Sequence, residues 1–511
     1  MSPSRPAPWW PHVAAYGPGL VAGAAMIAVA EALAALVRLR VGVVGAVAEL
    51  VRDVAPGAAV EGFIALVGTW DKPLLSGMVV AGALVLAAVS GRWRWGLLGL
   101  VGLGAVGLTA VLVESRRSGE AGASALTGAV PAVVATAVGV ALLQVLLDAR
   151  RASEQTRNPD ARRRVLVLLG VVATGAVLTG AASRVIGGAR RGVEQARAAL
   201  RLDVTGGRVP AGADLDVAGL GPWRVAAADF YRIDTAFAVP LVHPDDWRLR
   251  IHGMVEREVE LGFADLVERE RTEAWTTLTC VSNEVGGGLV GNAWWSGTRI
   301  APLLAEAGVL PGADAVLQTS SDGWTCGTPL EALTDERDAL LAYAMNGEPL
   351  PLEHGFPVRM VVPGLYGYVS ATKWVVDLEV TRFADFRAYW TERGWGERGP
   401  IKTQSRVLVP RPGDEVGAGE VVLAGDAWAQ HTGIERVEVQ VDGGAWREAD
   451  LGTVPSRDTW VQWSTTVRLD PGEHVVVVRA TDAAGQTQTA TQVGVLPDGA
   501  TGWDQVRFTV G

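Results

Sequence analysis

At 511 residues the chain is too long for one ordinary domain, so two or three structural units are expected. Its formal net charge of −10 lacks the basic character typical of nucleic-acid-binding proteins, so no nucleic-acid partner is expected. Apolar residues make up 49% of the sequence, and their concentration before about residue 190 indicates a membrane domain.

Five apolar runs in this first part are long enough, or nearly so, to cross a bilayer, which needs about 17–25 residues. They are residues 16–37, 74–90, 95–113, 121–147 and 165–187. We therefore predict five transmembrane helices, with six as the alternative. Residues 38–73 are partly apolar but carry interspersed charges, so we interpret them as an interfacial or re-entrant segment.

The loops between the runs predict their orientation. Residues 150–164 carry six arginines and residues 91–94 are also basic, so both loops are expected in the cytoplasm. Five spans then place everything after residue 190 on the extracytoplasmic side of the cell membrane. The first run is too long for the apolar part of a cleavable signal peptide.

The outer half contains a cysteine at the end of a predicted strand. Residues 276–279 are rich in β-branched side chains, Cys280 follows them, and residues 286–288 are glycines. A thiol beside such a loop suits a ligand to something bulky, because glycines let the backbone approach it closely. The alternative is a small buried apolar side chain, since free cysteine is often buried.

The chain after about residue 405 has the pattern of an all-β domain. Residues 437–441 alternate strictly between apolar and polar, and residues 442–444 are a hairpin signal. Roughly 100 residues of short strands are typical of an immunoglobulin-like sandwich. The two cysteines that define true immunoglobulin domains are absent, so the prediction rests on the strand pattern.

Several further motifs follow one another in the outer half in a fixed order. Besides the Cys280 loop they are Trp295-Ser296-Gly297, Asp322-Gly323-Trp324, residues 344–350, His354-Gly355-Phe356-Pro357-Val358-Arg359, Val362-Pro363-Gly364 and Lys373-Trp374. In this order they resemble the sulfite oxidase family of molybdopterin enzymes, over about residues 225–510. The membrane part resembles the multi-span leaders of some bacterial members.

The resemblance implies a three-part architecture. A multi-span α-helical membrane domain over residues 1–190 precedes an α+β sulfite-oxidase-type molybdopterin domain over residues 191–404 and an immunoglobulin-like β-sandwich over residues 405–511. The sandwich corresponds to the family's dimerisation domain, which implies a homodimer.

The resemblance also implies a molybdenum–molybdopterin cofactor and the residues that hold it. Cys280 would be the thiolate ligand of the metal, and soft thiolates suit such a metal. His354, Arg359 and Lys373 match cofactor-binding positions and would donate charge-assisted hydrogen bonds to its phosphate. The alternative for Arg359 and Lys373 is a solvated charge at a strand end.

Four more residues receive roles from the resemblance. Asn283 is placed with the cofactor-binding residues, whereas His243 is either a cofactor contact or a loop residue. Arg232 matches an arginine that lines the substrate pocket of sulfite oxidases, and we predict that it is catalytic together with Cys280. Cys326 is expected to be a packed thiol, because a disulfide would consume the metal ligand.

The chain departs from the family at the substrate pocket. Sulfite oxidases place an arginine five residues after the cysteine ligand, where this chain has Val285. Their Asn-His after the pocket arginine is Ile233-Asp234 here, and their active-site tyrosine falls roughly at Trp395. A doubly charged oxyanion needs converging cations, so these departures argue against sulfite as the substrate.

We therefore expect a membrane-anchored molybdopterin oxidoreductase that transfers an oxygen atom to or from a small-molecule substrate. A reductase of sulfoxides or other oxidised substrates is the alternative within the enzyme class. A cofactor-free binding module that retains the fold is the alternative outside it. The sequence has no Cys-x-x-Cys-His haem signature, so an external haem protein or a quinone is expected to exchange electrons with it.

Export of the outer half gives a first prediction. Molybdopterin cofactors are generally inserted in the cytoplasm, so the loaded domain must cross the membrane folded, which requires a twin-arginine signal. Arg162-Arg163 stands before the weakly apolar last run; the alternative is an ordinary positive-inside anchor. With Arg162→Lys and Arg163→Lys, which keep the charge, a reporter fused after Gly511 should no longer become accessible outside. Delivery of a molybdenum-loaded outer domain by this variant would contradict the prediction.

Overall fold

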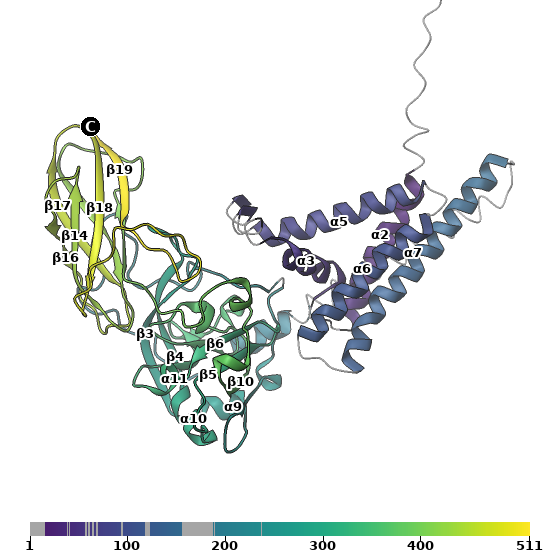
Figure 1. Ribbon diagram of the computed structural model, residues 1–511, viewed down its shortest axis with the longest axis horizontal. Helices are drawn as coiled ribbons and strands as arrows, with labels where there is room; N and C mark the ends of the chain where they lie inside the picture. Colours follow the sequence, from purple (N-terminus) through teal and green to yellow (C-terminus); the bar gives the residue numbers. More distant parts are fainter. Residues whose placement is uncertain are drawn as a thin grey trace, which may run out of the picture. The chain divides into compact units, whose positions relative to one another are not determined.

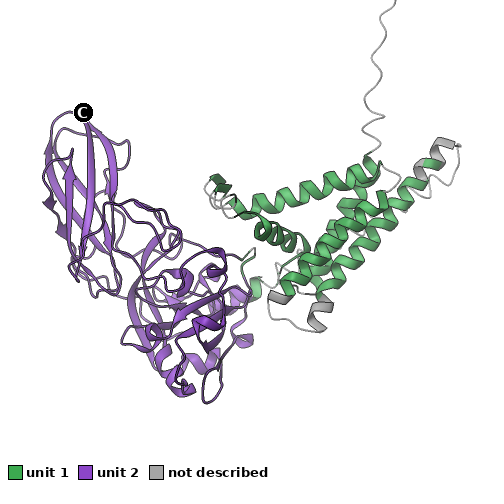
Figure 2. Cartoon of the chain, viewed as in Figure 1, with its two compact units in different colours: residues 1–192, 236–239 green, residues 193–235, 240–511 purple. Residues whose placement is uncertain are grey.

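The computed structural model describes residues 16–37, 39, 41–56, 59, 62–63, 66–67, 70–92, 96–117, 123–155, 188, 190–236 and 238–511. The chain forms two compact units, shown in Figure 2: residues 1–192 with 236–239, and residues 193–235 with 240–511. The predicted fifth span, residues 165–187, and the Arg162-Arg163 pair lie outside the described residues.

The first unit is helical (Figure 1). Its long helices are α2 (Gly17–Leu36), α3 (Val43–Val54), α5 (Asp71–Ser90), α6 (Gly96–Arg117) and α7 (Ala123–Gln155). In the described residues, four helical stretches are long and apolar enough to cross a membrane: Gly17–Leu36, Asp71–Ser90, Gly96–Ser115 and Gly128–Asp148. They coincide with the first four predicted runs, so those four are confirmed as apolar helices.

Helix α3 occupies the segment interpreted as interfacial or re-entrant. The Glu31 carboxylate of α2 accepts a hydrogen bond of 2.8 Å from the backbone N–H of Val44, so it caps the start of α3. Val43, Ala46 and Ala48 are buried, and α3 packs against α6. A helix of this length is too short to span a bilayer.

Two sheets build the first part of the second unit (Figure 1). One has the strand order β2-β1-β10-β5-β6, with β1 (Arg248–Gly253), β2 (Val259–Gly262), β5 (Ala315–Ser320), β6 (Thr325–Pro329) and β10 (Val375–Thr381). The other has the order β3-β4-β7-β8, with β9 also paired to β7; its strands are β3 (Arg271–Thr279), β4 (Val290–Arg299), β7 (Leu340–Met345), β8 (Glu348–Pro349) and β9 (Arg359–Val361).

Short helices lie between these strands or next to them in the chain. They are α9 (Phe263–Val267), α10 (Ile300–Ala307), α11 (Glu331–Thr334), η2 (Pro244–Asp246), η3 (Leu352–His354), η4 (Gly367–Val369), η5 (Phe383–Asp385) and η6 (Thr391–Arg393). Leu249 and Ile251 of β1 are fully buried in one apolar core, whereas the intervening Arg250 is exposed, as the alternation of a strand requires. Every residue of β7 is buried, as expected of a strand covered on both faces.

The rest of the second unit is a β-sandwich. One sheet has the order β11-β13-β17-β16, with β11 (Gln404–Val409), β13 (Gly419–Trp428), β16 (Asp450–Leu451) and β17 (Val461–Leu469). The other has the order β12-β19-β18-β14-β15, with β12 (Glu415–Val416), β14 (Ile434–Val441), β15 (Arg447–Glu448), β18 (Gly472–Asp482) and β19 (Asp504–Val510). Side chains from both sheets share one apolar core, including Val437 and Val439, so the strand predicted over residues 437–441 is confirmed.

Tryptophans join the sandwich to the strand that leads to Cys280. The indole N–H of Trp223 donates to the carbonyl of Trp460 at 3.1 Å, and the indole N–H of Trp460 donates to the carbonyl of Trp223 at 2.9 Å. The Trp223 ring also packs edge-on against Trp275 of β3, with 4.8 Å between ring centroids. These buried contacts fix the sandwich against β3.

Candidate active site

Cys280 lies where β3 ends and is buried, with 8% of its surface exposed. Its backbone N–H donates to the carbonyl of Leu289 at 2.9 Å, so residues 280–289 form a closed loop leading into β4. Burial raises the pKa of the Cys280 thiol, while hydrogen bonds with Ser282 and the positive charge of Lys373 oppose the shift. A metal ion bound there would hold the sulfur as a thiolate.

Asn283 closes this loop. Its side-chain oxygen accepts a hydrogen bond of 2.7 Å from the Leu289 N–H, and its own N–H donates to the Cys280 carbonyl at 3.1 Å. A Cβ atom on Gly287 would lie only 2.6 Å from the Asn283 oxygen, so glycine is required at that position. The side-chain oxygen of Asn283 is therefore engaged in a hydrogen bond within the loop that follows Cys280.

His354 is buried at the end of η3 and has one unsatisfied nitrogen. Its Nε2 donates to the carbonyl of Ala227 at 2.9 Å, which leaves a lone pair on Nδ1, and Nδ1 has no hydrogen-bond partner among the residues that the structure describes. Burial, together with the charges of Arg359 and Lys373, lowers the pKa of His354 to about 4. The ring is therefore neutral at pH 7 and presents an acceptor.

Arg359 is a buried cation without a carboxylate partner in the described part of the chain. Its guanidinium donates only to backbone carbonyls, of His354 at 3.2 Å and of Met360 and Ala371 at 3.4 Å each, and lies 5.1 Å from the centre of the Trp295 ring. Burial lowers its pKa to about 10, so it stays charged at pH 7. A charge buried in this way needs an anion.

Lys373 and Arg232 share one carboxylate. Lys373 Nζ lies 3.1 Å and Arg232 Nε lies 3.0 Å from the same oxygen of Asp234, and Lys373 also donates to the Glu353 carbonyl at 3.0 Å. Burial lowers the pKa of Lys373 to about 8, and Asp234 opposes the shift. The Arg232 side chain is 44% exposed, so it faces the outside of the site.

His243 takes part in a local turn. Its Nδ1 accepts a hydrogen bond of 3.3 Å from the Asp245 N–H at the start of η2, and its side chain is 38% exposed. Among the described contacts, none joins His243 to the group formed by Cys280, His354 and Arg359.

Two tyrosines near Cys280 were not assigned from the sequence. Tyr231 stacks on Phe230 at 5.2 Å; burial raises its pKa, and the charges of Cys280 and Arg359 also act on it. Burial raises the pKa of Tyr366 to about 12, and a charged Cys280 adds to the shift. Only their positions in the sequence could have indicated them, because Tyr231 directly precedes Arg232 and Tyr366 lies two residues after the Val362-Pro363-Gly364 motif. Trp395, at the family's tyrosine position, instead packs against Tyr368 at 5.9 Å.

These side chains suit a molybdopterin cofactor. Arg359 and Lys373 are buried cations that can donate to a phosphate, and the bare Nδ1 of His354 can accept from an N–H group of a pterin. Gly355 has φ +106°, and a Cβ there would lie 3.0 Å from the Cβ of Arg359 and 3.1 Å from Lys373. The glycine thus lets the two cations sit side by side.

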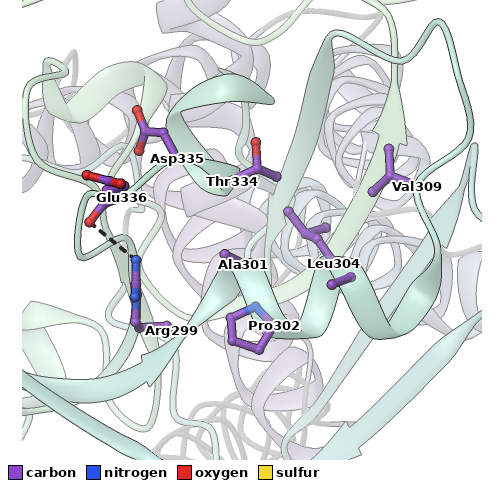
Figure 3. Close-up of a pocket in the computed structure, with 9 residues that line it drawn as sticks. Arg299, Ala301, Pro302, Leu304, Val309, Thr334, Asp335 and Glu336 are labelled. Atoms are coloured by element: carbon purple, nitrogen blue, oxygen red, sulfur yellow. Dashed lines mark hydrogen bonds between the residues drawn. The ribbon is translucent and has the colours of Figure 1, made fainter.

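Cys326 and a pocket at the start of α10 play no part in this arrangement. Cys326 is a free, fully buried thiol, and its sulfur lies 3.2 Å from the Thr372 hydroxyl. Figure 3 shows a pocket of about 590 Å³ lined by Arg299, Ala301, Pro302, Leu304, Ala305, Val309, Thr334, Asp335 and Glu336. Its one cation, Arg299, already donates to the Glu336 carbonyl at 3.3 Å, so the pocket lacks the donors found around Cys280.

Comparison with known proteins agrees with this chemistry. Residues 236–390 match the family described as oxidoreductase molybdopterin binding domain. Sulfite oxidase of Gallus gallus is 31% identical over 299 residues, which cover 49% of this chain and 65% of that protein. The uncharacterized oxidoreductase YuiH of Bacillus subtilis is 35% identical over 176 residues, which cover 33% of this chain and 84% of that protein.

Among solved structures, the sulfane dehydrogenase SoxCD of Paracoccus pantotrophus aligns with a TM-score of 0.48 and 26% identity, over 53% of this chain and 76% of that chain. The chain covers between 46% and 65% of the length of the vertebrate sulfite oxidases that it matches.

The matched region contains Cys280, His354, Arg359 and Lys373, so the family and the site coincide. The cofactor of this chain is molybdenum–molybdopterin, and residues 236–390 form an oxidoreductase domain that is similar to the sulfite oxidases. Because it matches YuiH over most of that protein's length as well, the chain belongs to the family of molybdopterin-binding oxidoreductases.

Proposed function

We propose that the protein is a membrane-anchored oxidoreductase that transfers an oxygen atom at a molybdenum ion ligated by Cys280. The observation that carries the proposal is a buried thiol beside buried cations, one of which, Arg359, has no carboxylate partner in the described chain. When bound, the cofactor supplies the two-electron exchange that accompanies oxygen transfer to or from a small-molecule substrate.

The chain's own residues bind and orient the cofactor and the substrate. Arg359 and Lys373 hold the phosphate, and His354 accepts a hydrogen bond at Nδ1 because its low pKa keeps that atom unprotonated at neutral pH. Arg232, whose side chain is partly exposed, would meet the substrate. Asn283 acts through the loop that presents Cys280, and His243 remains a candidate contact.

The charge around Arg232 favours a substrate that is not a dianion. Asp234 offsets much of the charge of both Arg232 and Lys373, and position 285, where sulfite oxidases have an arginine, is valine. A neutral sulfur compound needs no such cation. Reduction of sulfoxides is therefore the second candidate function, on the same cofactor. A cofactor-free binding module is disfavoured because it would leave Arg359 buried without an anion.

The membrane and electron partners follow from the same proposal. Four apolar helices, together with the predicted fifth span over residues 165–187, would anchor the enzyme as a multi-pass protein of the cell membrane, with the catalytic part on the extracytoplasmic side. A haem protein or a quinone exchanges the electrons one at a time. Residues 405–511, as an immunoglobulin-like domain, would form the homodimer.

Replacement of Cys280 tests the metal ligand. In Cys280→Ser, activity should be lost and the absorption and paramagnetic resonance spectra of molybdenum should change, because an alcohol is a poor substitute for a thiolate. Cys326→Ser is the matched control, since that thiol is buried among hydroxyls, and it should keep both. An active Cys280→Ser protein with an unaltered molybdenum spectrum would show that Cys280 is not the metal ligand.

Cofactor retention tests the cationic residues. Loss of a hydrogen bond to a charged group costs about 1.5–3 kcal/mol, so Arg359→Gln or Lys373→Gln should each speed cofactor loss about tenfold to a hundredfold. The double variant should be empty. Release is followed by metal content after gel filtration, with Arg299→Gln as the control at a cation outside the site. Equal retention by all four proteins would show that these cations do not hold the cofactor.

Restoring the missing arginine tests the substrate class. The purified, molybdenum-loaded chain is screened with sulfite and with sulfoxides, using artificial electron carriers. We expect turnover of a neutral sulfur compound to exceed that of sulfite. Val285→Arg should raise kcat/KM for sulfite about tenfold or more, because it adds a charge-assisted donor. Val285→Met, which adds length without charge, should not. Efficient sulfite oxidation by the unmodified chain would refute this substrate class.

A further inference from the structure

The loop that carries Cys280 is held from outside by the β-sandwich. The guanidinium of Arg406, on β11, donates through Nη1 to the carbonyl oxygen of Gly287 at 2.8 Å. The two residues are 119 positions apart in the sequence. Gly287 belongs to the turn that Asn283 closes, so this hydrogen bond reaches the cysteine loop directly.

Arg406 is held in place by a buried ion pair. Its Nη2 and Nε lie 2.7 Å and 3.2 Å from one oxygen of Asp426, and the two side chains are only 9% and 2% exposed. The guanidinium also lies 5.8 Å from the ring centre of Trp428 and 5.6 Å from that of Trp460. With its other donors engaged in this way, the guanidinium can present Nη1 in only one direction.

A second contact beside Arg406 holds the same loop. Gly286 has φ +74°, and a Cβ atom there would lie 2.5 Å from a carboxylate oxygen of Asp504 on β19. The other oxygen of Asp504 accepts a hydrogen bond of 2.8 Å from the N–H of Val407, the neighbour of Arg406. The loop therefore rests on β11 and β19 together, and only glycine permits this close approach.

The sandwich also holds the strand on the other side of Cys280. Gln430 donates through its amide to the Thr277 carbonyl at 3.2 Å and to the Thr279 hydroxyl at 2.8 Å. The N–H of Trp460 donates to the Thr277 hydroxyl at 2.8 Å. Cys280 is thus bracketed by contacts of one domain to the strand before it and to the loop after it.

We propose that Arg406 is a positioning residue of the active site, and that its hydrogen bond to Gly287 fixes the loop that aims the Cys280 sulfur at the metal. The inference rests on the proposed function, because it takes Cys280 as the ligand. Arg406 itself touches neither substrate nor cofactor. Through Arg406, the β-sandwich would influence the chemistry of a site that is built on β3, β9 and β10.

The geometry favours this role over general stabilisation of the sandwich. Arg479 shows what a stabilising arginine looks like there: it pairs with Glu438 at 3.0 Å and lies 4.1 Å from the ring centre of Trp446, all on the sandwich. Arg406 has the same kinds of partners, a carboxylate and indole rings, but it also donates a hydrogen bond to the cysteine loop. Arg479 is therefore the matched control.

Hydrogen exchange in the full-length, purified protein measures the loop directly. Three proteins are compared with the unmodified chain: Arg406→Met with Asp426→Leu, Arg406→Lys, and Arg479→Met. The double variant replaces the buried pair by apolar side chains, a change that often leaves stability unaltered, and so separates the loop contact from folding. Lysine keeps a charge for Asp426 but cannot reproduce the forked donors of arginine.

We expect exchange of the amides in residues 284–289 to rise about tenfold to a hundredfold in both Arg406 proteins, as loss of a charged donor implies. Exchange in β7 and β17 should stay unchanged, and Arg479→Met should leave the loop unaffected. The paramagnetic resonance spectrum of molybdenum should shift in the Arg406 proteins and not in Arg479→Met, because only the former alter the direction of the sulfur.

Two results would overturn the proposal. Unchanged exchange in residues 284–289 would show that Arg406 does not hold the loop. Faster exchange in β17 to the same extent as in the loop would show that Arg406 only stabilises the sandwich. Neither result depends on whether Cys280 binds the metal, which the Cys280→Ser spectrum decides separately, so failure of this inference and failure of the proposed function are distinguishable.

Discussion

The burial of Arg359 without a carboxylate partner in the described part of the chain is the constraint on which the catalytic half depends. Taking a guanidinium out of water costs several kcal/mol unless an anion or strong acceptors replace the lost hydration. Among the described residues, only three carbonyls at 3.2–3.4 Å and the Trp295 ring do so. A bound phosphate would supply the rest, and a ligand that binds only the folded chain stabilises it. Cofactor loading and folding of this half would therefore be energetically coupled.

The residues of the site come from separate parts of the chain and not from one local motif. Cys280 lies after β3, His354 and Arg359 flank the turn into β9, and Lys373 precedes β10. The strand residues next to the site are buried, namely the last five of β3, all of β9 and the first of β10, so these strand ends are rigid. The reciprocal indole hydrogen bonds of Trp223 and Trp460 extend that rigidity into the sandwich. The sandwich is part of the scaffold of the site, since its contacts reach both flanks of the cysteine.

The sequence could predict those parts of the fold and of the site that neighbouring residues determine. The strand before Cys280, the glycines after it and the alternation over residues 437–441 are local signals, and four of the five predicted spans are confirmed as apolar helices. The sequence could not show which side chains meet in space. Asn283 turns its oxygen back on its own loop, Tyr231 and Tyr366 lie near Cys280, and Arg406 reaches Gly287 across 119 residues. The periodicity of the sequence does not reveal such contacts, because they depend on how β3 packs against the sandwich.

Asp234 reduces the positive charge that the site can offer to a substrate. One of its oxygens is 3.0 Å from Arg232 and 3.1 Å from Lys373, so it offsets charge on both. Lys373 is buried and Arg232 is partly exposed, so solvent screens Arg232 further. A phosphate held by Arg359 and Lys373 would add negative charge on the inner side. The field left around Arg232 would then be weak, and a substrate pocket there would lack the net positive charge that a dianion requires.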